Sequence, residues 1–198
     1  ATVIAKALQY NTSLTTLDLS VNKIGKIGAI SLSKALHQSS LEGLGLGYNT
    51  IGAIGASALA NALPQSSLKD LDLKYSEIGI VGANVLANVL PQSSLEELNL
   101  GYNNIWSIGA SALANALPES KLTHLFLAQN EIGNIGAVAL ANALPNSELK
   151  YLNLELNKIG EIGANVIAKA LPQSSTITQI ILDNNRIGDA GAAALAKA

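Results

Sequence analysis

The chain has 198 residues, of which 48% are hydrophobic and only 13% are charged, so its composition excludes an intrinsically disordered protein. Twelve Lys and Arg residues against fourteen Asp and Glu residues give a net charge of -2, which lacks the positive excess that nucleic acid binding requires. Cysteine is absent, no apolar run is long enough to span a membrane, and no leader segment opens the chain. We therefore expect a folded cytoplasmic protein with no nucleic acid or membrane partner.

A motif of 27 residues recurs along the chain and reads L-x-x-L-x-L-x-x-N-x-I-G-x-I-G-A-x-x-L-A-x-A-L-P. Its copies are 27 residues apart, except that the last spacing is 28 because one residue is added near Thr176. A fixed period is the mark of a repeat protein, so the sequence predicts a single solenoid over residues 1–198. The first position of the motif falls at seven sites: Leu14, Leu41, Leu68, Leu95, Leu122, Leu149 and Ile177.

The predicted elements follow the same order in every repeat. Residues 1–13 contain the helix half of an incomplete repeat, and seven repeats follow over residues 14–198, the last of them truncated. Around Asp18 two leucines alternate with polar residues, which is typical of a short, half-buried strand. From Ala29 to Leu36 the apolar residues lie on one helical face, and a Pro after the last Leu of most repeats should stop the helix. The incomplete first unit, the truncated end and the absence of Met predict a fragment of a longer chain.

A single strand and helix of this size cannot bury their leucines alone, so the repeats must stack. The strands should form one parallel sheet, and the helices should form a second layer. Helices are wider than the spacing of about 4.8 Å between strands, so the stack must curve with the strands inside. The sequence therefore predicts an α/β solenoid shaped as an open arc. Its glycines, such as Gly25 and Gly28, should mark tight bends and close contacts between repeats.

With these motifs, the sequence resembles leucine-rich repeat proteins of the ribonuclease-inhibitor-like subclass. That subclass includes ribonuclease inhibitor, the sensor arrays of nucleotide-binding immune receptors, and Ran GTPase-activating protein. The N-x-I-G and L-A-x-A-L elements are most similar to the repeats of immune receptors and bacterial effectors. Ribonuclease inhibitor itself is rich in cysteine and alternates two repeat types, whereas this chain has no cysteine and a single repeat type. The resemblance implies a horseshoe with a concave parallel sheet, convex helices and a protein partner.

The resemblance also implies a ladder of buried asparagines, because in the family the Asn after each strand bonds backbone groups of its own and the adjacent coil. The third repeat has Ser76 at this position, and a hydroxyl offers only one donor. At least one backbone group beside Ser76 should therefore lack a protein partner. The expected ladder consists of Asn22, Asn49, Asn103, Asn130, Asn157 and Asn185.

Strand positions between the core leucines should point to the concave face, which is the surface that varies most between repeats. The seven windows from the first Leu to the residue before the Asn hold a local excess of five negative charges. A partner with a basic patch would be attracted there, although these side chains could also simply be solvated. The acidic residues are Asp18, Glu42, Asp70, Asp72, Glu96, Glu97, Glu155 and Asp183, and the basic ones are Lys69, Lys74 and Lys150. Among the acids, we predict contact with the partner for Asp70, Asp72, Glu97 and Glu155.

Aromatic residues are scarce, and most of them fall on the predicted concave side. Tyr48, Tyr75 and Tyr102 occupy one repeat position and should form a column along the rim. Phe126 has a central strand position, beside His124 and near Tyr151 on the next strand. Since aromatic side chains are favoured in recognition surfaces, we predict that these five aromatics bind the partner. The alternative is that they only stabilise the sheet by stacking across strands.

Trp106 stands where every other repeat has Gly. Its place on a loop makes it a further candidate for partner binding, as an exposed anchor, while filling a gap beside the Ser76 repeat is the alternative.

Catalytic interpretations have little support. His37 and His124 are the only histidines, and no Asp, His and Ser arrangement or zinc-ligand pair accompanies them. The glycines of residues 43–47 lack the spacing of a phosphate-binding loop. Arg186, the only arginine, could act on GTP hydrolysis if the likeness to Ran GTPase-activating protein extended to function, but its repeat position is an ordinary variable one. We therefore expect no enzyme, no cofactor and no metal.

The leading hypothesis is a rigid, non-catalytic scaffold that binds a protein through its concave face. Its setting would be an immune-receptor array or a bacterial effector that is delivered into a host cell. The alternatives are a regulator of a small GTPase and an architectural spacer.

Overall fold

The computed structural model describes all 198 residues, and in it seven short strands form one parallel sheet in chain order. The strands pair in register, so that Leu44 of one repeat lies beside Leu71 of the next. This is the topology that the stacked repeats predict. The strands are β1 (Thr16–Asp18), β2 (Gly43–Gly45), β3 (Asp70–Asp72), β4 (Glu97–Asn99), β5 (His124–Phe126), β6 (Tyr151–Asn153) and β7 (Gln179–Ile181).

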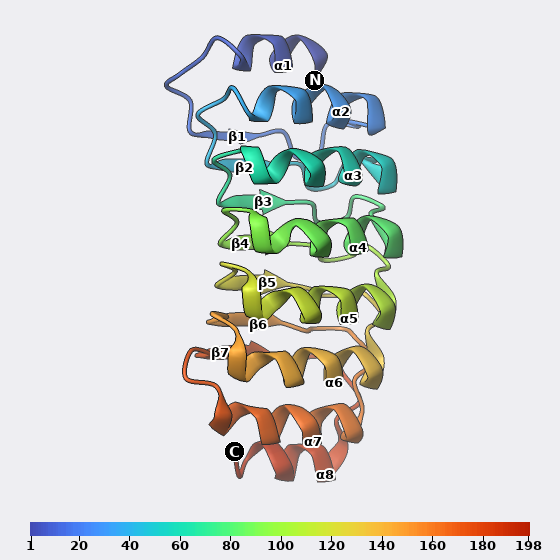
Figure 1. The fold of residues 1–198 in the computed structure, drawn as a ribbon. Helices are drawn as coiled ribbons and strands as arrows, with labels where there is room; N and C mark the ends of the chain where they lie inside the picture. Colours follow the sequence, from blue (N-terminus) through green and yellow to red (C-terminus); the bar gives the residue numbers. More distant parts are fainter.

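Eight α-helices form the second layer, stacked in one column along the sheet (Figure 1). Each helix packs against the helices of the neighbouring repeats, because its small residues allow close approach. None of the helices is both long and apolar enough to cross a lipid bilayer. The helices are α1 (Thr2–Leu8), α2 (Lys26–Leu36), α3 (Gly52–Ala62), α4 (Gly79–Val89), α5 (Trp106–Ala116), α6 (Gly133–Ala143), α7 (Glu161–Ala170) and α8 (Gly188–Leu195).

The helix ends differ slightly from the prediction. We expected each helix to continue through its last Leu and to stop at the Pro that follows. In five repeats the α-helix ends one residue before that Leu, and the Leu and Pro lie together in a 3₁₀ turn. Pro fits the start of such a turn because its missing N–H would have no partner there. The turns are Leu63–Gln65, Leu90–Gln92, Leu117–Glu119, Leu144–Asn146 and Leu171–Gln173.

The two glycines of the motif serve different purposes in the four repeats whose first glycine has a positive φ, at Gly52, Gly79, Gly133 and Gly188. Gly52 has a φ of +66°, a left-handed conformation that glycine adopts without steric strain. Gly55 lies where a Cβ atom would be 2.9 Å from the Cβ of Ala29 in the preceding repeat. The first glycine therefore turns the chain into the helix, and the second lets neighbouring helices approach.

The core runs continuously between the two layers and contains 47 buried residues. The leucines of the strands are almost fully buried from Leu44 to Leu152, whereas Leu17 and Ile180 in the end repeats are only partly buried. The interior repeats are thus covered on both sides, and the two end repeats are covered on one side only.

The asparagine positions link successive repeats. The Oδ1 atom of Asn103 accepts hydrogen bonds from the backbone N–H groups of Ser76 (2.9 Å) and Ile78 (3.1 Å). Its Nδ2 group donates to the carbonyl oxygens of Leu73 (2.7 Å) and Gly101 (3.1 Å). One amide side chain thereby satisfies four backbone groups that would otherwise be unpaired inside the protein. The same arrangement recurs at Asn49, Asn130, Asn157 and Asn185, while Asn22 in the first repeat is exposed.

Ser76 interrupts this pattern. Its hydroxyl lies 3.2 Å from the carbonyl oxygens of Leu46 and Lys74, and it can donate to only one of them at a time. The backbone N–H groups of Asn49 and Ile51, which correspond to those that bond Asn in other repeats, have no acceptor. Both residues are buried, so the serine leaves two N–H groups unpaired in the protein interior.

Candidate functional site

The open face of the sheet carries the first and third side chains of every strand, because the middle residue points into the core. Reading across the sheet, the first positions run from Thr16 on β1 to Gln179 on β7, and the third positions run from Asp18 to Ile181. These two rows, with the loops that follow the strands, make up the concave face. Its composition changes from acidic at β1–β4 to aromatic at β5–β6.

The acidic part is built around a strand that has no side chains on the open face. Gly43 and Gly45 lie on β2, and the carboxylates of Asp18 on β1 and Asp72 on β3 lie on either side of this strand. The Oδ1 atom of Asp18 is 2.6 Å from where a Cβ atom of Gly45 would be, so it leans over the bare backbone. These residues line a hollow of about 200 Å³, together with Asp70. The hollow therefore has a glycine floor and carboxylate walls.

Two of these carboxylates lie in an environment that disfavours their charged form. Burial raises the pKa of Asp70, and the nearby carboxylates of Glu97 and Asp72 raise it further. Burial also raises the pKa of Asp72, against the opposing effects of the Lys74 backbone N–H and ammonium group. The pKa of Asp18 is lowered by hydrogen bonds from the hydroxyl and N–H of Ser20.

Few cations neutralise this acidic region. Lys69 forms an ion pair with Glu42 at 3.0 Å, and both side chains are about half exposed. No ion pair reaches Asp18, Asp70 or Asp72. The acidic hollow therefore keeps its charge available for a cationic group from another molecule.

The tyrosine column lies on the loops directly after β2, β3 and β4. The ring centroids of Tyr48 and Tyr75 are 5.4 Å apart in a stacked arrangement, and those of Tyr75 and Tyr102 are 6.0 Å apart and tilted. All three residues have a positive φ between +52° and +61°, which is uncommon for a side chain of this size. The repeat geometry thus holds the three rings in a row at the rim of the concave face.

Lys74 stabilises this row. Its Nζ atom lies 5.6 Å from the ring centroid of Tyr48 and 5.3 Å from that of Tyr102, within the range of a cation–π contact. The neighbouring repeats have Gly47 and Gly101 at the position of Lys74, and the stem of Lys74 lies against Gly101, where a Cβ atom would be 3.7 Å from its Cγ atom. From the sequence, Lys74 was predicted only as a basic residue of the concave face. Its position between tyrosines at the same position of neighbouring repeats, next to Gly101, was the signal that could have identified its contacts.

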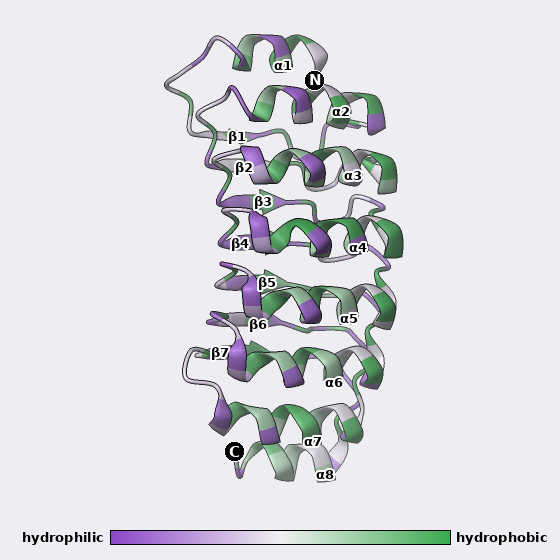
Figure 2. Ribbon diagram, viewed as in Figure 1, coloured by the Kyte–Doolittle hydropathy of each residue, from purple (hydrophilic) through white to green (hydrophobic).

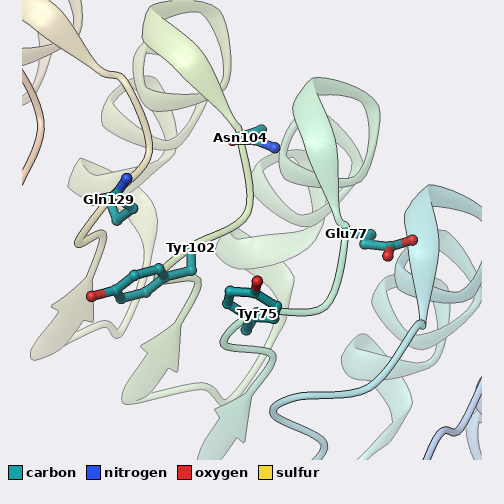
Figure 3. Close-up of a pocket in the computed structure, with 5 residues that line it drawn as sticks. All are labelled: Tyr75, Glu77, Tyr102, Asn104 and Gln129. Atoms are coloured by element: carbon teal, nitrogen blue, oxygen red, sulfur yellow. The ribbon is translucent and has the colours of Figure 1, made fainter.

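A hollow of about 350 Å³ lies beside the tyrosines. It is lined by five side chains from three neighbouring loops, and Figure 3 shows how they surround it: Tyr75, Glu77, Tyr102, Asn104 and Gln129. The hollow combines aromatic rings with a carboxylate and two amides. Sequence reasoning missed Glu77 and Asn104 because their loop position varies between repeats, and it missed Gln129 because this residue stands at the repeat position of the tyrosines without being aromatic.

The second aromatic group lies on β5 and β6. The ring centroid of Tyr151 is 4.9 Å from that of Phe126 and 5.8 Å from that of His124. The ring of Phe126 is half-buried, and His124 also contacts the hydroxyl of Thr123 at 2.9 Å. The predicted aromatic residues therefore lie in two separate groups, one at the rim and one on the sheet.

The remaining predicted residues are spread more widely. Glu97 lies on β4 directly beside Asp70, and Glu155 is half-buried on the loop after β6. Trp106 lies apart from the concave face, at the first position of α5, and its side chain is 47% exposed. A Cβ atom at the equivalent Gly79 or Gly133 would meet nothing within 4 Å, so this position has no interior gap to fill. No group of three or more His, Cys, Asp and Glu side chains is placed to hold a metal ion.

The comparisons with known proteins fit this geometry. A family model described as Leucine Rich repeat matches the chain in six segments: 10–33, 37–60, 92–114, 120–141, 146–168 and 173–196. The chain is a leucine-rich repeat protein. The matches leave out residues 61–91, the part that contains Ser76 and Lys74, although β3 and α4 fold there as in the other repeats. A search of curated proteins gave no match. Proteins of this repeat family commonly bind other proteins and are typically not catalysts.

Proposed function

We propose that this leucine-rich repeat array is a non-catalytic scaffold that binds a protein partner with a basic patch on its concave face. The observation that carries the proposal is the acidic hollow over β2. Asp18, Asp70 and Asp72 surround bare glycine backbone, and none of them has a cation within ion-pair distance. An arginine or lysine side chain could lie on the glycine floor between them, where it would relieve the repulsion between the carboxylates.

The aromatic groups support the same proposal. The tyrosine row is half-exposed and held in place by Lys74, so its rings lose little conformational entropy when they contact a partner. Phe126 and Tyr151 offer apolar area on the sheet, farther along the array. The partner would then span the face from the acidic hollow to the aromatic pair.

The test is a capture experiment from extracts of host and bacterial cells with three immobilised forms of the chain. The first is the wild type, and the second carries Asp70→Lys with Asp72→Lys. The third carries Glu119→Lys, in the 3₁₀ turn after α5, with Glu148→Lys, on the loop before β6. Both residues are exposed and lie outside the strands, and this form has the same net charge as the second. A specific partner should bind the first and third forms and be lost with the second. Binding that survives in all three forms would contradict the proposal.

A second pair of variants tests the aromatic contribution. Tyr75→Ala and Phe126→Ala should each weaken the captured complex by tenfold or more if these rings are contact residues. The same variants should change thermal stability only slightly, since both rings are on the open face. If neither variant weakens any complex, the aromatics only stabilise the sheet and the architectural-spacer hypothesis gains support.

The GTPase-regulator hypothesis depends on Arg186, which is exposed on the loop after β7 and forms no ion pair. Stimulated GTP hydrolysis that disappears in Arg186→Ala would favour that function over the scaffold. The setting that we propose is the cytoplasm, either of the producing cell or, for a bacterial effector, of its host.

A further inference from the structure

The second isoleucine of the repeat motif points to the solvent. In six repeats an Ile or Val occupies the first turn of the helix and is between 58% and 73% exposed. These residues follow one another at intervals of 27 positions, so they line up along the array where the helices begin. We refer to them as the aliphatic ladder: Ile27, Ile54, Val81, Ile108, Ile135 and Ile162.

The ladder places an apolar residue at the same edge of six successive repeats. Figure 2 shows hydrophobic colour at the starting turns of α3 to α7, in a column on the right-hand edge of the array. Single exposed aliphatic residues are normal on protein surfaces, but an aligned series of six is not. Core packing does not account for the ladder, because the first isoleucine of the motif, such as Ile51 or Ile78, fills the core in each repeat.

Trp106 lies at the middle of this edge. It begins α5 two residues before Ile108, and its φ of +57° places a bulky side chain in a conformation that glycine occupies in most other repeats. Such strain costs on the order of 1–3 kcal/mol and is most often found at functional positions. In the neighbouring repeat the equivalent Gly79 is bare, and a Cβ atom there would meet nothing within 4 Å. The edge therefore has one projecting ring and, one repeat away, an open space.

From these observations we propose that two copies of the chain pair antiparallel through their aliphatic ladders. A two-fold axis between repeats three and four would place Val81 of one copy opposite Ile108 of the other, and Ile27 opposite Ile162. A second copy fits because it has the same spacing between ladder residues along its whole length. The same axis places Trp106 of each copy opposite Gly79 of the other, near the centre of the interface where anchor residues are usually found.

The charges that flank the ladder agree with this antiparallel order. Lys26 precedes Ile27, and Glu161 precedes Ile162, and both are exposed. In the antiparallel pair each Lys26 faces Glu161 of the other copy, which gives one pair of opposite charges at each end. Lys23 would face Lys158, whose charge is already paired with Glu131 at 3.0 Å. A parallel pair would instead place each of these charges against its own kind.

The area of the ladder determines how tightly the two copies should bind each other. Helices pack about 8–10 Å apart, so six of them give an edge about 40–50 Å long and about one helix diameter, 10–12 Å, wide. This area of roughly 400–600 Å² per copy grows when Trp106 and the flanking loops are included, and a standard interface buries about 800 Å² per partner. We therefore expect a dimer that dissociates in the micromolar range. The concave face is formed by the sheet, whereas the ladder lies on the helices, so the concave face stays free to bind its own partner in the dimer.

The experiment measures the mass of the purified chain by light scattering or sedimentation between about 1 and 300 μM. The wild type should approach twice its mass of 20.4 kDa as the concentration rises. A variant with Val81→Glu, Ile108→Glu and Ile135→Glu should remain a monomer at every concentration. The control with Asn88→Glu, Asn115→Glu and Asn142→Glu places the same charges on exposed positions of the same three helices and should dimerise as the wild type does.

Circular dichroism shows whether each variant is folded, and only folded variants are compared. The single variant Trp106→Gly restores the residue of most other repeats and relieves the strained φ. It should therefore unfold at a higher temperature than the wild type and yet dimerise at least fivefold more weakly. A wild type that stays a monomer at 300 μM, or a ladder variant that still dimerises, would overturn the proposal.

The absence of cysteine allows the orientation to be tested by cross-linking. An equimolar mixture of the Ile27→Cys and Ile162→Cys variants should form a disulfide-linked dimer under mild oxidation, because the antiparallel pair places these positions opposite each other. Ile27→Cys alone should not do so, because its two copies would lie at opposite ends of the interface. The reverse result would show a parallel pair and contradict the proposed arrangement.

Discussion

At the scale of single residues, one asparagine side chain in most repeats forms hydrogen bonds to the backbone of its own repeat and of the preceding one. An Asn can accept from two backbone N–H groups and donate to two carbonyl oxygens at the same time, and no other residue of its size does both. The resemblance to leucine-rich repeat proteins implied this ladder before the structure was known, and the serine at position 76 predicted its weak point. The contacts of Lys74 were not predicted, because they depend on tyrosine rings from two neighbouring repeats and on the absence of a side chain at Gly101.

Ser76→Asn should therefore stabilise the protein. The new side chain would give the buried N–H groups of Asn49 and Ile51 an acceptor, and each unpaired buried group costs about 1–3 kcal/mol. We expect the free energy of unfolding in urea to rise by about 1–3 kcal/mol, with no change in the denaturant slope. The reverse change, Asn103→Ser, serves as the matched control and should lower it by a similar amount. A lower stability of Ser76→Asn would show that the wider side chain does not fit.

At the scale of strands and helices, periodicity predicted which elements form, and local chemistry decided where they begin and end. At the loop position of Lys23, five repeats adopt a positive φ, whereas Thr50 and Arg186 do not and instead pair with Gly25 and Gly160 of the preceding repeats. In both cases the paired glycine is extended, with a φ of -98° or -99°. The β-branched side chain of Thr50 disfavours the left-handed conformation, but nothing in the structure explains the exception at Arg186. The acidic hollow was not visible as a hollow in the sequence, because it results from strand register. Only the pairing of β1 and β3 on either side of β2 brings Asp18 and Asp72 over the glycines.

The pairing of β3 with β4 leads to a prediction about pH. Asp70 lies directly opposite Glu97, and its pKa is raised by burial and by the neighbouring carboxylates. A carboxyl group whose pKa is higher in the folded state than in the unfolded state destabilises the fold once pH rises above both values. Below the unfolded value of about 3.9 this penalty is absent.

Asp70→Asn should remove that penalty. Like charges directly opposite each other cost about 0.2–1 kcal/mol, so the variant should be more stable than the wild type by about this amount at pH 7. The difference should disappear toward pH 3. Urea unfolding from pH 3 to 8 measures it, and Glu148→Gln on an exposed loop is the control that should show no such difference. A variant that is less stable at pH 7 would mean that Asp70 is held by a contact that favours its charge.

At the scale of the whole molecule, stability is distributed along the array instead of being concentrated at a centre. Each repeat is stabilised by its neighbours, so an interior repeat has two interfaces and an end repeat has one. The same leucine position shows the consequence, because Leu98 in β4 is fully buried while Leu17 in β1 is only partly buried. The near-identical sequences of the repeats predict that all of them adopt the same structure. They do not predict that all of them are equally stable.

Truncation of this leucine to alanine should therefore have unequal effects at the two positions. Leu98→Ala leaves a cavity between two packed layers and should cost about 2–5 kcal/mol of unfolding free energy. Leu17→Ala removes the same atoms from a site that is open on one side, and it should cost less than half as much. Amide hydrogen exchange should also distinguish the two variants. Leu17→Ala should speed exchange only in the first repeats, whereas Leu98→Ala should speed it throughout the array. Equal losses at the two positions would contradict this prediction and show that the end repeats are as firmly held as the interior ones.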